Sequence, residues 1–488
     1  MDYSTLLNQE QLKPVTDTEG AVLVLAGAGS GKTRVLTYRI AYLIEKCGVS
    51  PNSILAITFT NKAAGEMKER IQAVTGQDGM WVMTFHSFCA RVLRNDADKL
   101  GHNRNFSIYG EAESDRIITR ILKENFPDDT DKKKTIRWNI SAAKSIAMTP
   151  EQYAVRIKDH PECDLITQVY TKYEEELAKN NAFDFDDLLL KTFLLFAMHK
   201  DVLEKYQDRF LYVHVDEFQD TNKIQFLLVK MLVRKYGNIF VVGDDDQSIY
   251  GWRGADVGNI LNFKKDYPDC RIYKLERNYR SSGNILKTAN KVIANNAGRM
   301  GKQLWTDKED GIEVSYRSMG DDKTEADFVL EQIMNLVKNH GYRYSDFAIL
   351  VRINSITRIF EDRMSSYGMP YKVIGGFKFY ERKEIKDFIA YLRMAVNPAD
   401  GESVTRIINF PKRGIGDACV EALIQACAER NMSLFDGLMT LDELELSPAY
   451  KKKLAQFAAL AKDISEKKDD MPLDEYVKYV FDKVDFYS

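Results

Sequence analysis

The chain has 488 residues, too many for one hydrophobic core, so several domains are expected. It is 44% hydrophobic and 29% charged, and no apolar run is long enough to cross a bilayer, which excludes a conventional integral membrane protein. A net charge of −3 neither requires nor excludes a nucleic-acid partner, because binding grooves are local. The six cysteines never form C-x-x-C, and the start shows no secretory signal, so we expect reduced thiols, no structural zinc and a cytoplasmic location.

The first motif follows the apolar run "AVLVL" and reads "AGAGSGKTRVL". Its glycines let successive backbone N–H groups point at phosphate oxygens, and the helix expected from Lys32 adds its positive end. Lys32 would reach the β- and γ-phosphates, and the Thr33 hydroxyl would hold Mg²⁺. The alternative is a glycine-rich strand-to-helix turn with a chance lysine. The predicted nucleotide-binding loop consists of Ala26, Gly27, Ala28, Gly29, Ser30, Gly31, Lys32 and Thr33.

Two further motifs precede a long helical region. "ITFTNKAAGEM" places Phe59, Asn61 and Lys62 at the exit of an expected strand, and "TFHSFCARVLR" offers Thr84 and His86. The second motif by itself is equally the start of an ordinary amphipathic helix. Between about 86 and 210 no buried strand is expected. That charged, helical stretch, with "PDDTDKKK" (127–134) as a solvated loop, predicts an inserted helical domain.

An acidic pair ends the next apolar run, "LYVHVDEFQDTN". Asp216 is placed to take Mg²⁺, and Glu217 to orient and deprotonate an attacking water. The alternative is a strand end capped by acidic residues. Protein-kinase chemistry is disfavoured because the HRD and DFG motifs are absent from the sequence, so water is the expected acceptor.

A third polar loop follows "NIFVVGD" and reads "GDDDQSIYGWRGA". Gln247 is placed to touch a γ-phosphate. Tyr250, Trp252 and Arg253 present two aromatic faces and a cation in a glycine-containing turn. Nucleic-acid bases stack on such faces whatever their sequence. An aromatic cluster of this kind is also typical of a hydrophobic core, and composition leaves both interpretations open.

The alternation of short β-branched runs with helical periodicity predicts an α/β fold, with a parallel open sheet whose ligands gather at the strands' carboxyl ends. A second α/β zone is expected to start near "CRIYKLERNYR" and to include a strand in "YSDFAILVR" (344–352); helices follow from about 377. The expected division is a first α/β domain in two parts, a helical insertion, the first part of a second α/β domain, and an outer helical domain: 1–85 with 211–276, 86–210, 277–376 and 377–488.

Together these motifs resemble those of the UvrD/PcrA/Rep group of superfamily-one DNA helicases. "LNQEQ" is similar to the Q motif, "AGAGSGKT" to motif I, "TFTNKAA" to Ia, "TFHSF" to Ib, "VDEFQDTN" to II, "GDDDQSIYGWRGA" to III and "LERNYRSS" to IV. "FDFDDLL" (183–189) resembles a further family motif. The resemblance implies a RecA-like P-loop motor domain with an inserted helical domain, plus an incomplete second RecA-like domain with a helical insertion.

The resemblance also implies roles for individual residues. Gln11 would read the adenine edge, Tyr279 would stack on the base, Arg280 would act as an arginine finger, and Arg34 would contact the nucleotide. Gln247 would couple the γ-phosphate to the DNA groove. The residues implied in DNA binding are Phe59, Asn61, Lys62, Thr84, His86, Phe185, Tyr250, Trp252, Arg253, Arg352, Asn354, Gly414, Ile415 and Gly416. The last three form a turn before a helix whose N-terminus would hold a duplex phosphate.

The expected activity is an ATP- and Mg²⁺-dependent DNA helicase, moving 3′ to 5′ as the family does, acting on single-stranded DNA and single/double-strand junctions in repair or replication. The family's motifs V and VI do not occur in these residues, so we expect an N-terminal fragment with impaired turnover. Two alternatives stay open: a nucleotide- and DNA-binding module without productive unwinding, and a subunit of a helicase–nuclease.

Overall fold

A computed structural model describes residues 1–296, 298–374 and 382–486, except the side chain of Arg253. Its central feature is a parallel sheet of six strands in the order β3-β2-β6-β7-β1-β8. The strands predicted in the four apolar runs are confirmed as β1, β2, β6 and β7. The six strands are β1 (Ala21–Ala26), β2 (Ile54–Thr58), β3 (Trp81–Thr84), β6 (Tyr212–Val215), β7 (Ile239–Gly243) and β8 (Arg271–Leu275).

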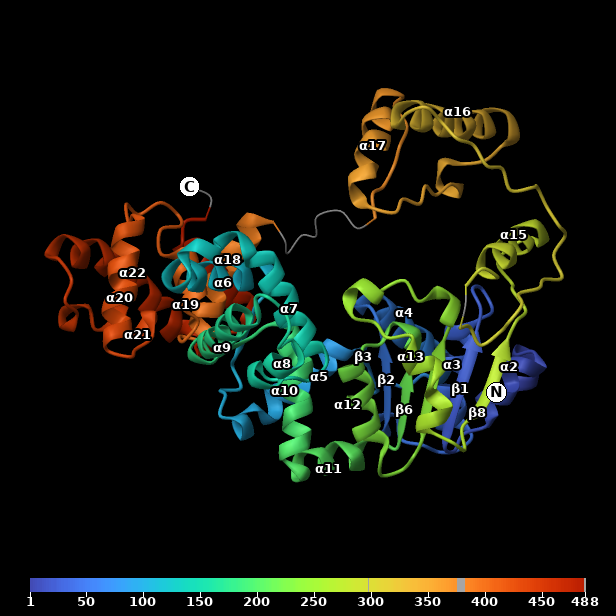
Figure 1. The fold of residues 1–488 in the computed structure, drawn as a ribbon, viewed down its shortest axis with the longest axis horizontal. Coiled ribbons are helices and arrows are strands. Elements are labelled where there is room, and N and C mark those ends of the chain that lie inside the picture. The colour runs from blue at the N-terminus through green and yellow to red at the C-terminus, as the bar shows by residue number, and fades with distance from the viewer. Residues whose placement is uncertain (297, 375–381, 487–488) are drawn as a thin grey trace.

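Helices cover both faces of this sheet (Figure 1). Because side chains alternate along a strand, Leu23 and Leu25 of β1 pack on one face while Val22 and Val24 pack on the other. The first face is covered by α5, α10 and α12, and the second by α2, α3 and α4. These helices are α2 (Gln9–Thr16), α3 (Lys32–Glu45), α4 (Asn61–Thr75), α5 (Phe85–Asp96), α10 (Phe185–Met198) and α12 (Lys223–Val233); short helices α1 (Tyr3–Leu6), α13 (Gly258–Leu261) and α14 (Phe263–Asp266) complete the unit.

Most of the region 86–210 is helical, as predicted, and α6, α7, α8 and α9 share a core of their own. The region also contains two strands of two residues each, β4 (Ser107–Ile108) and β5 (Ala182–Phe183), which the sequence did not indicate. Residues 127–132 form a surface 3₁₀ turn with no buried side chain. The remaining helices of this region are α6 (Glu111–Asn125), α7 (Lys133–Ser145), α8 (Pro150–Arg156), α9 (Cys163–Lys179) and α11 (Lys200–Arg209).

Two expectations for the second α/β zone are wrong. Residues 271–275 form β8, which pairs with β1 and completes the edge of the first sheet. Residues 344–352 contain a 3₁₀ turn and no strand, and Leu350 is 94% exposed. A strand needs a neighbouring backbone to satisfy its N–H and C=O groups, and the described part of 277–374 offers only one isolated bridge, between Arg277 and Trp305.

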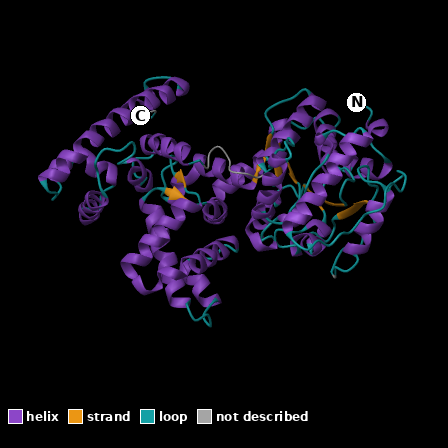
Figure 2. Ribbon diagram, turned by 90° about the horizontal axis from the view of Figure 1, so that it is seen from above, coloured by secondary structure: helices purple, strands orange, loops and turns teal. Residues whose placement is uncertain are grey.

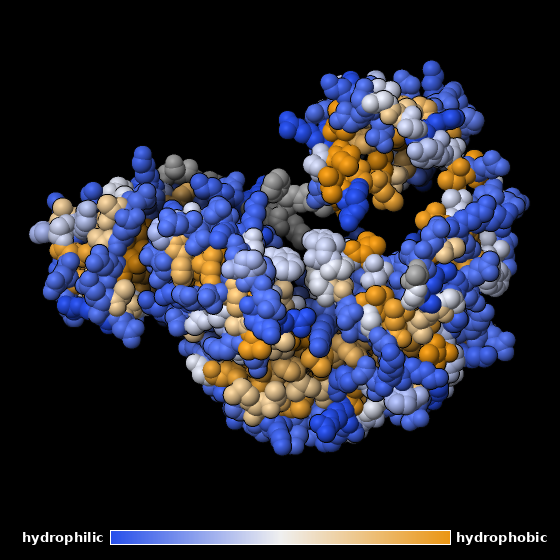
Figure 3. All heavy atoms as spheres, viewed as in Figure 1, coloured by the Kyte–Doolittle hydropathy of each residue, from blue (hydrophilic) through white to orange (hydrophobic). Residues whose placement is uncertain are grey.

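The described part of the zone instead contains three α-helices: α15 (Gly283–Ile293), α16 (Asp322–His340) and α17 (Thr357–Ser366). In Figure 1, α16 and α17 form a small lobe that stands apart from the sheet, and Figure 3 shows apolar side chains on the visible face of that lobe. Its core is small, built around Leu330, Ile333 and Met369.

The helices from Lys383 to Lys483 form a bundle with its own core, and they lie beside α6 and α9 in Figure 1. Figure 2, seen from above, shows the end of the molecule that carries the C-terminus as mostly helical. The contact is polar: Ser107 and Tyr109 donate hydrogen bonds to Asp400, at 2.5 and 2.6 Å, and Arg116 pairs with Glu402 at 2.9 Å. The proposed boundary at 376/377 falls outside the described residues. The helices are α18 (Lys383–Val396), α19 (Gly401–Ile407), α20 (Asp417–Glu429), α21 (Leu434–Met439), α22 (Pro448–Glu466) and α23 (Leu473–Lys483).

Within the described ranges, no helix combines the length and the apolar character that crossing a membrane requires.

Candidate functional site

The predicted motifs lie along one edge of the sheet. The phosphate loop follows β1, the acidic pair follows β6, the aspartate triplet follows β7, and Phe59 and Thr84 lie at the ends of β2 and β3. Parallel strands end at the same edge of a sheet. The strand order therefore places the loops after β1 and β7 side by side, and the residues at the ends of β2 and β3 further along that edge. The edge therefore carries the glycine-rich loop after β1, carboxylates after β6 and β7, and aromatic side chains after β2 and β7.

The phosphate loop has the backbone shape that its glycines allow. Gly29 and Gly31 have φ values of 68° and 95°, in the left-handed region that glycine occupies without strain. Helix α3 begins at Lys32, as predicted. The backbone N–H groups of its first turn, which have no partner within the helix, therefore lie at the loop. This arrangement fits an anionic ligand.

The acidic pair meets the phosphate loop through Lys32. The Nζ of Lys32 lies 2.9 Å from Oε2 of Glu217, whose own backbone is left-handed at φ 50°. Asp216 is buried behind it. Burial and the Glu217 charge raise the pKa of Asp216 to about 6, although Lys32 opposes them. A buried carboxylate with a raised pKa gains from a nearby cation, and carboxylate and hydroxyl oxygens such as those of Asp216 and Thr33 are of the kind that Mg²⁺ prefers.

A buried glutamine joins the acidic pair to the loop after β7. Gln219 donates to Oε2 of Glu217 at 2.9 Å, and its own Oε1 accepts the N–H of Asp244, also at 2.9 Å. Gln247 in turn donates to the Asp244 carboxylate. A chain of two hydrogen bonds thus connects Glu217, the carboxylate expected to activate water, to Asp244, and a third hydrogen bond extends the chain to Gln247.

The residues expected around the nucleotide base lie next to the loop. Gln11 is buried and donates to the carbonyl of Ser30 at 3.0 Å. Tyr279 is held by a 2.6 Å hydrogen bond from Asn8 and by its own N–H to the carbonyl of Gly29. Arg34 points elsewhere in this structure: its guanidinium donates to the carbonyl of Leu6 at 2.7 Å.

Arg280 lies beside the loop as well. A Cβ built on Gly29 would come within 2.9 Å of the Cβ of Arg280, so this close approach needs glycine. Asn278 fixes the segment by donating to the carbonyl of Ala28 at 2.6 Å and accepting the N–H of Arg280 at 2.8 Å. Arg280 is exposed, so its guanidinium is free to reorient on the solvent side of the loop.

The aromatic residues form two groups. The rings of Phe59 and Tyr250 stack with centroids 5.1 Å apart, and Trp252, 6.4 Å from Tyr250, is 63% exposed. His86 and Phe185 meet edge to face at 5.8 Å, and burial lowers the pKa of His86, which favours its neutral form. The exposure of Trp252 disfavours the hydrophobic-core interpretation for that ring. The predicted Arg253 side chain lies outside the described residues.

The polar residues beside these rings are linked. Thr84 caps α5 by accepting the N–H of Ser87, and the Ser87 hydroxyl donates to Asn61 at 3.4 Å. Lys62 is exposed, with only Glu66 near it at 3.8 Å.

The other residues expected to bind DNA lie outside this edge. Arg352 and Asn354 are exposed near α17, and Gly414-Ile415-Gly416 precedes α20 in the C-terminal bundle. Ile415 is buried and its N–H donates to Asn409, so that amide already has a partner.

Three residues near the site were missed by sequence reasoning: Asn278, Leu304 and Lys302. Asn278 and Leu304 contact the phosphate loop, and Lys302 pairs with the aspartate triplet. The sequence held one signal for Lys302: three consecutive aspartates at the end of a buried strand require a cation nearby.

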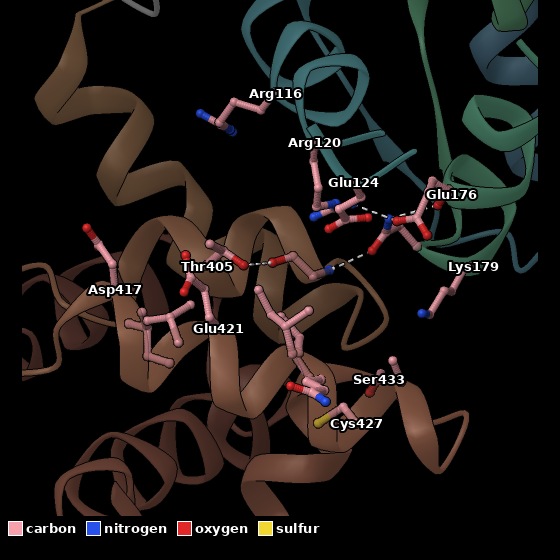
Figure 4. Close-up of a pocket in the computed structure, with 18 of the residues that line it drawn as sticks. Arg116, Arg120, Glu124, Glu176, Lys179, Thr405, Asp417, Glu421, Cys427 and Ser433 are labelled. Atoms are coloured by element: carbon pink, nitrogen blue, oxygen red, sulfur yellow. Dashed lines mark hydrogen bonds and ion pairs between the residues drawn. The ribbon is translucent and has the colours of Figure 1, made fainter. Parts of the chain in front are cut away.

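A cavity of about 1210 Å³ lies away from this edge, between α6 and α9 on one side and α19, α20 and α21 on the other. Figure 4 shows its mixed lining: Arg120 points toward Glu124 and Glu176, while Asp417 and Glu421 come from α20. Both charge signs line it and Arg120 is already paired with Glu176 at 2.6 Å. We assign this cavity no ligand.

The sheet order, the glycine-rich loop after β1 and the acidic pair after β6 are those of a RecA-like P-loop fold. The chain matches the UvrD/REP helicase N-terminal domain over residues 7–268 and the UvrD-like helicase C-terminal domain over residues 273–484. It therefore belongs to the UvrD/REP helicase family, and the resemblance read from the motifs is confirmed.

Individual relatives agree. The chain is 45% identical over 480 residues to the ATP-dependent DNA helicase PcrA of Staphylococcus aureus strain Mu50, which covers 98% of this chain and 66% of that protein. It is 44% identical over 483 residues to the protein of the same name from Bacillus subtilis strain 168, with 98% and 65% covered. The chain thus spans 65–66% of the length of these relatives.

Proposed function

We propose that this chain is the motor of an ATP-dependent DNA helicase and translocase that binds single-stranded DNA and separates duplex DNA. The observation that carries the proposal is the shared sheet edge: the loop that bears the exposed Trp252 follows β7, between the strands that precede Glu217 and Lys32, and Gln219 joins Glu217 to that loop through Asp244. Family membership and the names of the similar proteins support it.

In the proposed mechanism Lys32 leaves Glu217 for the β- and γ-phosphates when ATP binds, which frees Glu217 to take a proton from the attacking water. Arg280 stabilises charge that develops on the γ-phosphate. Gln11 and Tyr279 hold the base, Arg34 turns toward the nucleotide, and Gln247 transmits the presence of the γ-phosphate to the loop after β7.

Asp216 and Thr33 would hold Mg²⁺, which would supply positive charge to offset that of the nucleotide's phosphates. The fit rests on the buried carboxylate of Asp216, with a pKa raised to about 6, and on the chemistry of the Thr33 hydroxyl on the first turn of α3.

For DNA, we propose that Phe59, Tyr250 and Trp252 stack on successive bases, with His86 and Phe185 forming a second stacking pocket. Stacking uses a face that every base has, so little sequence preference is expected. The other residues expected to bind DNA would contact the backbone of the strand or, at junctions, of the duplex: Asn61, Lys62, Thr84, Arg253, Arg352, Asn354, Gly414, Ile415 and Gly416.

We further propose 3′ to 5′ movement, a role in repair or replication, and the domain division 1–85 with 211–276, 86–210, 277–376 and 377–488. A cytoplasmic location is proposed from the cysteines, all six of which are free thiols in the structure.

The test is ATP hydrolysis by the 488-residue chain with and without oligo-dT, for the wild type and Glu217→Gln. We expect DNA to stimulate hydrolysis in the wild type, and the variant to bind Mg·ATP but not hydrolyse it. Nucleotide and DNA binding without stimulated hydrolysis in the wild type would favour the binding-module alternative. Loss of nucleotide binding in Glu217→Gln would contradict the role given to that carboxylate.

A further inference from the structure

Three adjacent aspartates open the loop that carries Gln247 and Tyr250. Carboxylate oxygens of Asp244, Asp245 and Asp246 all lie within 4.8 Å of one another, and Asp244 is buried. Like charges at that separation repel strongly in a partly buried site. The loop therefore keeps this shape only if a cation is held among the three carboxylates.

Lys302 supplies that cation. Its Nζ lies 2.7 Å from Asp244 and 2.8 Å from Asp246, and it also pairs with Asp245, while the side chain is only 3% exposed. Arg299 adds a second cation, 2.6 Å from Asp246. Burial works to lower the pKa of Lys302, but the three carboxylates outweigh it and raise the pKa, so the amine stays charged.

The segment that carries Lys302 also reaches the phosphate loop. A Cβ on Gly27 would collide with the side chain of Leu304, so the two are in close contact. The carbonyl of Trp305 accepts the N–H of Asn278 at 2.7 Å, and Asn278 donates to the carbonyl of Ala28. One short stretch of chain thus contacts the nucleotide-binding loop and the loop that bears the aromatic residues.

We propose that Lys302 is a positioning residue that couples nucleotide binding to single-stranded DNA binding. By holding Asp244 it fixes two of the hydrogen bonds of that residue, with Gln219 on the side of the acidic pair and with Gln247 on the side of the aromatic loop. A shift of the phosphate loop on ATP binding then moves residues 302–305 and, through Lys302, the loop that bears Tyr250. This inference rests on the proposed function.

The test needs no turnover. We would measure the Kd of labelled oligo-dT for the 488-residue chain by fluorescence anisotropy, with and without a saturating non-hydrolysable ATP analogue and Mg²⁺. Coupling between two sites is typically about 5-fold or more in affinity, so the wild-type ratio of the two Kd values should differ from one by at least that much. In Lys302→Met the ratio should fall to within about twofold of one, while each ligand alone still binds.

Lys287→Met is the matched control, because Lys287 makes one exposed pair, 2.8 Å from Asp310, and should leave the ratio unchanged. Lys302→Arg keeps the charge and should restore coupling, which separates positioning from a loss of folded protein. A wild-type ratio in Lys302→Met would overturn the inference, as would a folded Lys302→Arg that binds both ligands without coupling. If the wild type binds both ligands with a ratio of one, this inference fails and the proposed function stands; if it binds neither, the proposed function itself fails.

Discussion

Replacing Lys144 with methionine should destabilise the first helical domain severely. Lys144 lies on α7 with its side chain fully buried, and its Nζ is 2.6 Å from Glu174, 2.8 Å from Asp184 and 2.8 Å from Asp187. Burial works to lower the pKa of Lys144, but Asp184, Asp187 and Glu174 raise it well above the ordinary value, so the lysine is a permanent cation.

The magnitude follows from the charges left behind. Burial, Asp184 and Glu174 raise the pKa of Asp187 to about 8, so near pH 7 its carboxyl is largely neutral. Lys144 and Lys191 then balance Glu174 and Asp184, and Lys191 pairs with Glu174 at 2.8 Å. Removing Lys144 strands one buried negative charge, and breaking a buried pair in this way typically costs about 3–5 kcal/mol.

The loss should also reach the DNA site, because Asp184 caps α10 and Phe185 is the first residue of that helix. The assay is hydrogen exchange of peptides from α7 and α10, which reports the local free energy of opening, together with the Kd for oligo-dT. Lys133→Met is the control on the same helix. Lys133 makes a long ion pair, 3.9 Å from Asp115, and is partly exposed, so its loss should lower the free energy of opening by less than about 1 kcal/mol. If the local free energy of opening in Lys144→Met lay within about 1 kcal/mol of the wild-type value, the charge balance around Lys144 would be wrong.

Other changes test other parts of the molecule. Lys32→Ala should weaken Mg·ATP binding measured by titration, because the phosphate loop loses its mobile cation, and unchanged affinity would refute the site. Trp252→Ala should weaken binding of poly-dT and of mixed-sequence DNA alike, by about 1–3 kcal/mol; a large fall in Tm with the Kd unchanged would indicate a core role instead. Because the pKa of Asp187 is raised, the folded wild type holds a proton that the unfolded chain releases between about pH 4 and about pH 8. The wild type therefore loses stability as the pH rises over that range, and Asp187→Asn should gain stability relative to it. Denaturant unfolding of both proteins at pH 5, 7 and 8.5 measures the difference, and a difference that does not change with pH would contradict the shift.

Local sequence was sufficient for the parts of the fold whose signals lie within a few residues. The runs that became β1, β2, β6 and β7 are apolar on both faces, as strands covered by helices on both sides must be. The glycines before Lys32 and the start of α3 at that residue are equally local. Parallel strands end at a common edge, so the meeting of the phosphate loop with the acidic pair could be predicted as well.

The tertiary structure decided the features that depend on partners far along the chain. The run 271–275 has a strand's composition, but only the open edge of β1 placed it in the first sheet; 344–352 has the same composition and, among the described residues, no neighbouring strand to pair with. Lys302 looks like an ordinary surface lysine in the sequence, yet it is buried against carboxylates more than 50 residues earlier. Hydrogen bonding between strands and ion pairing in a desolvated site both depend on which distant segments meet, and no local pattern records that.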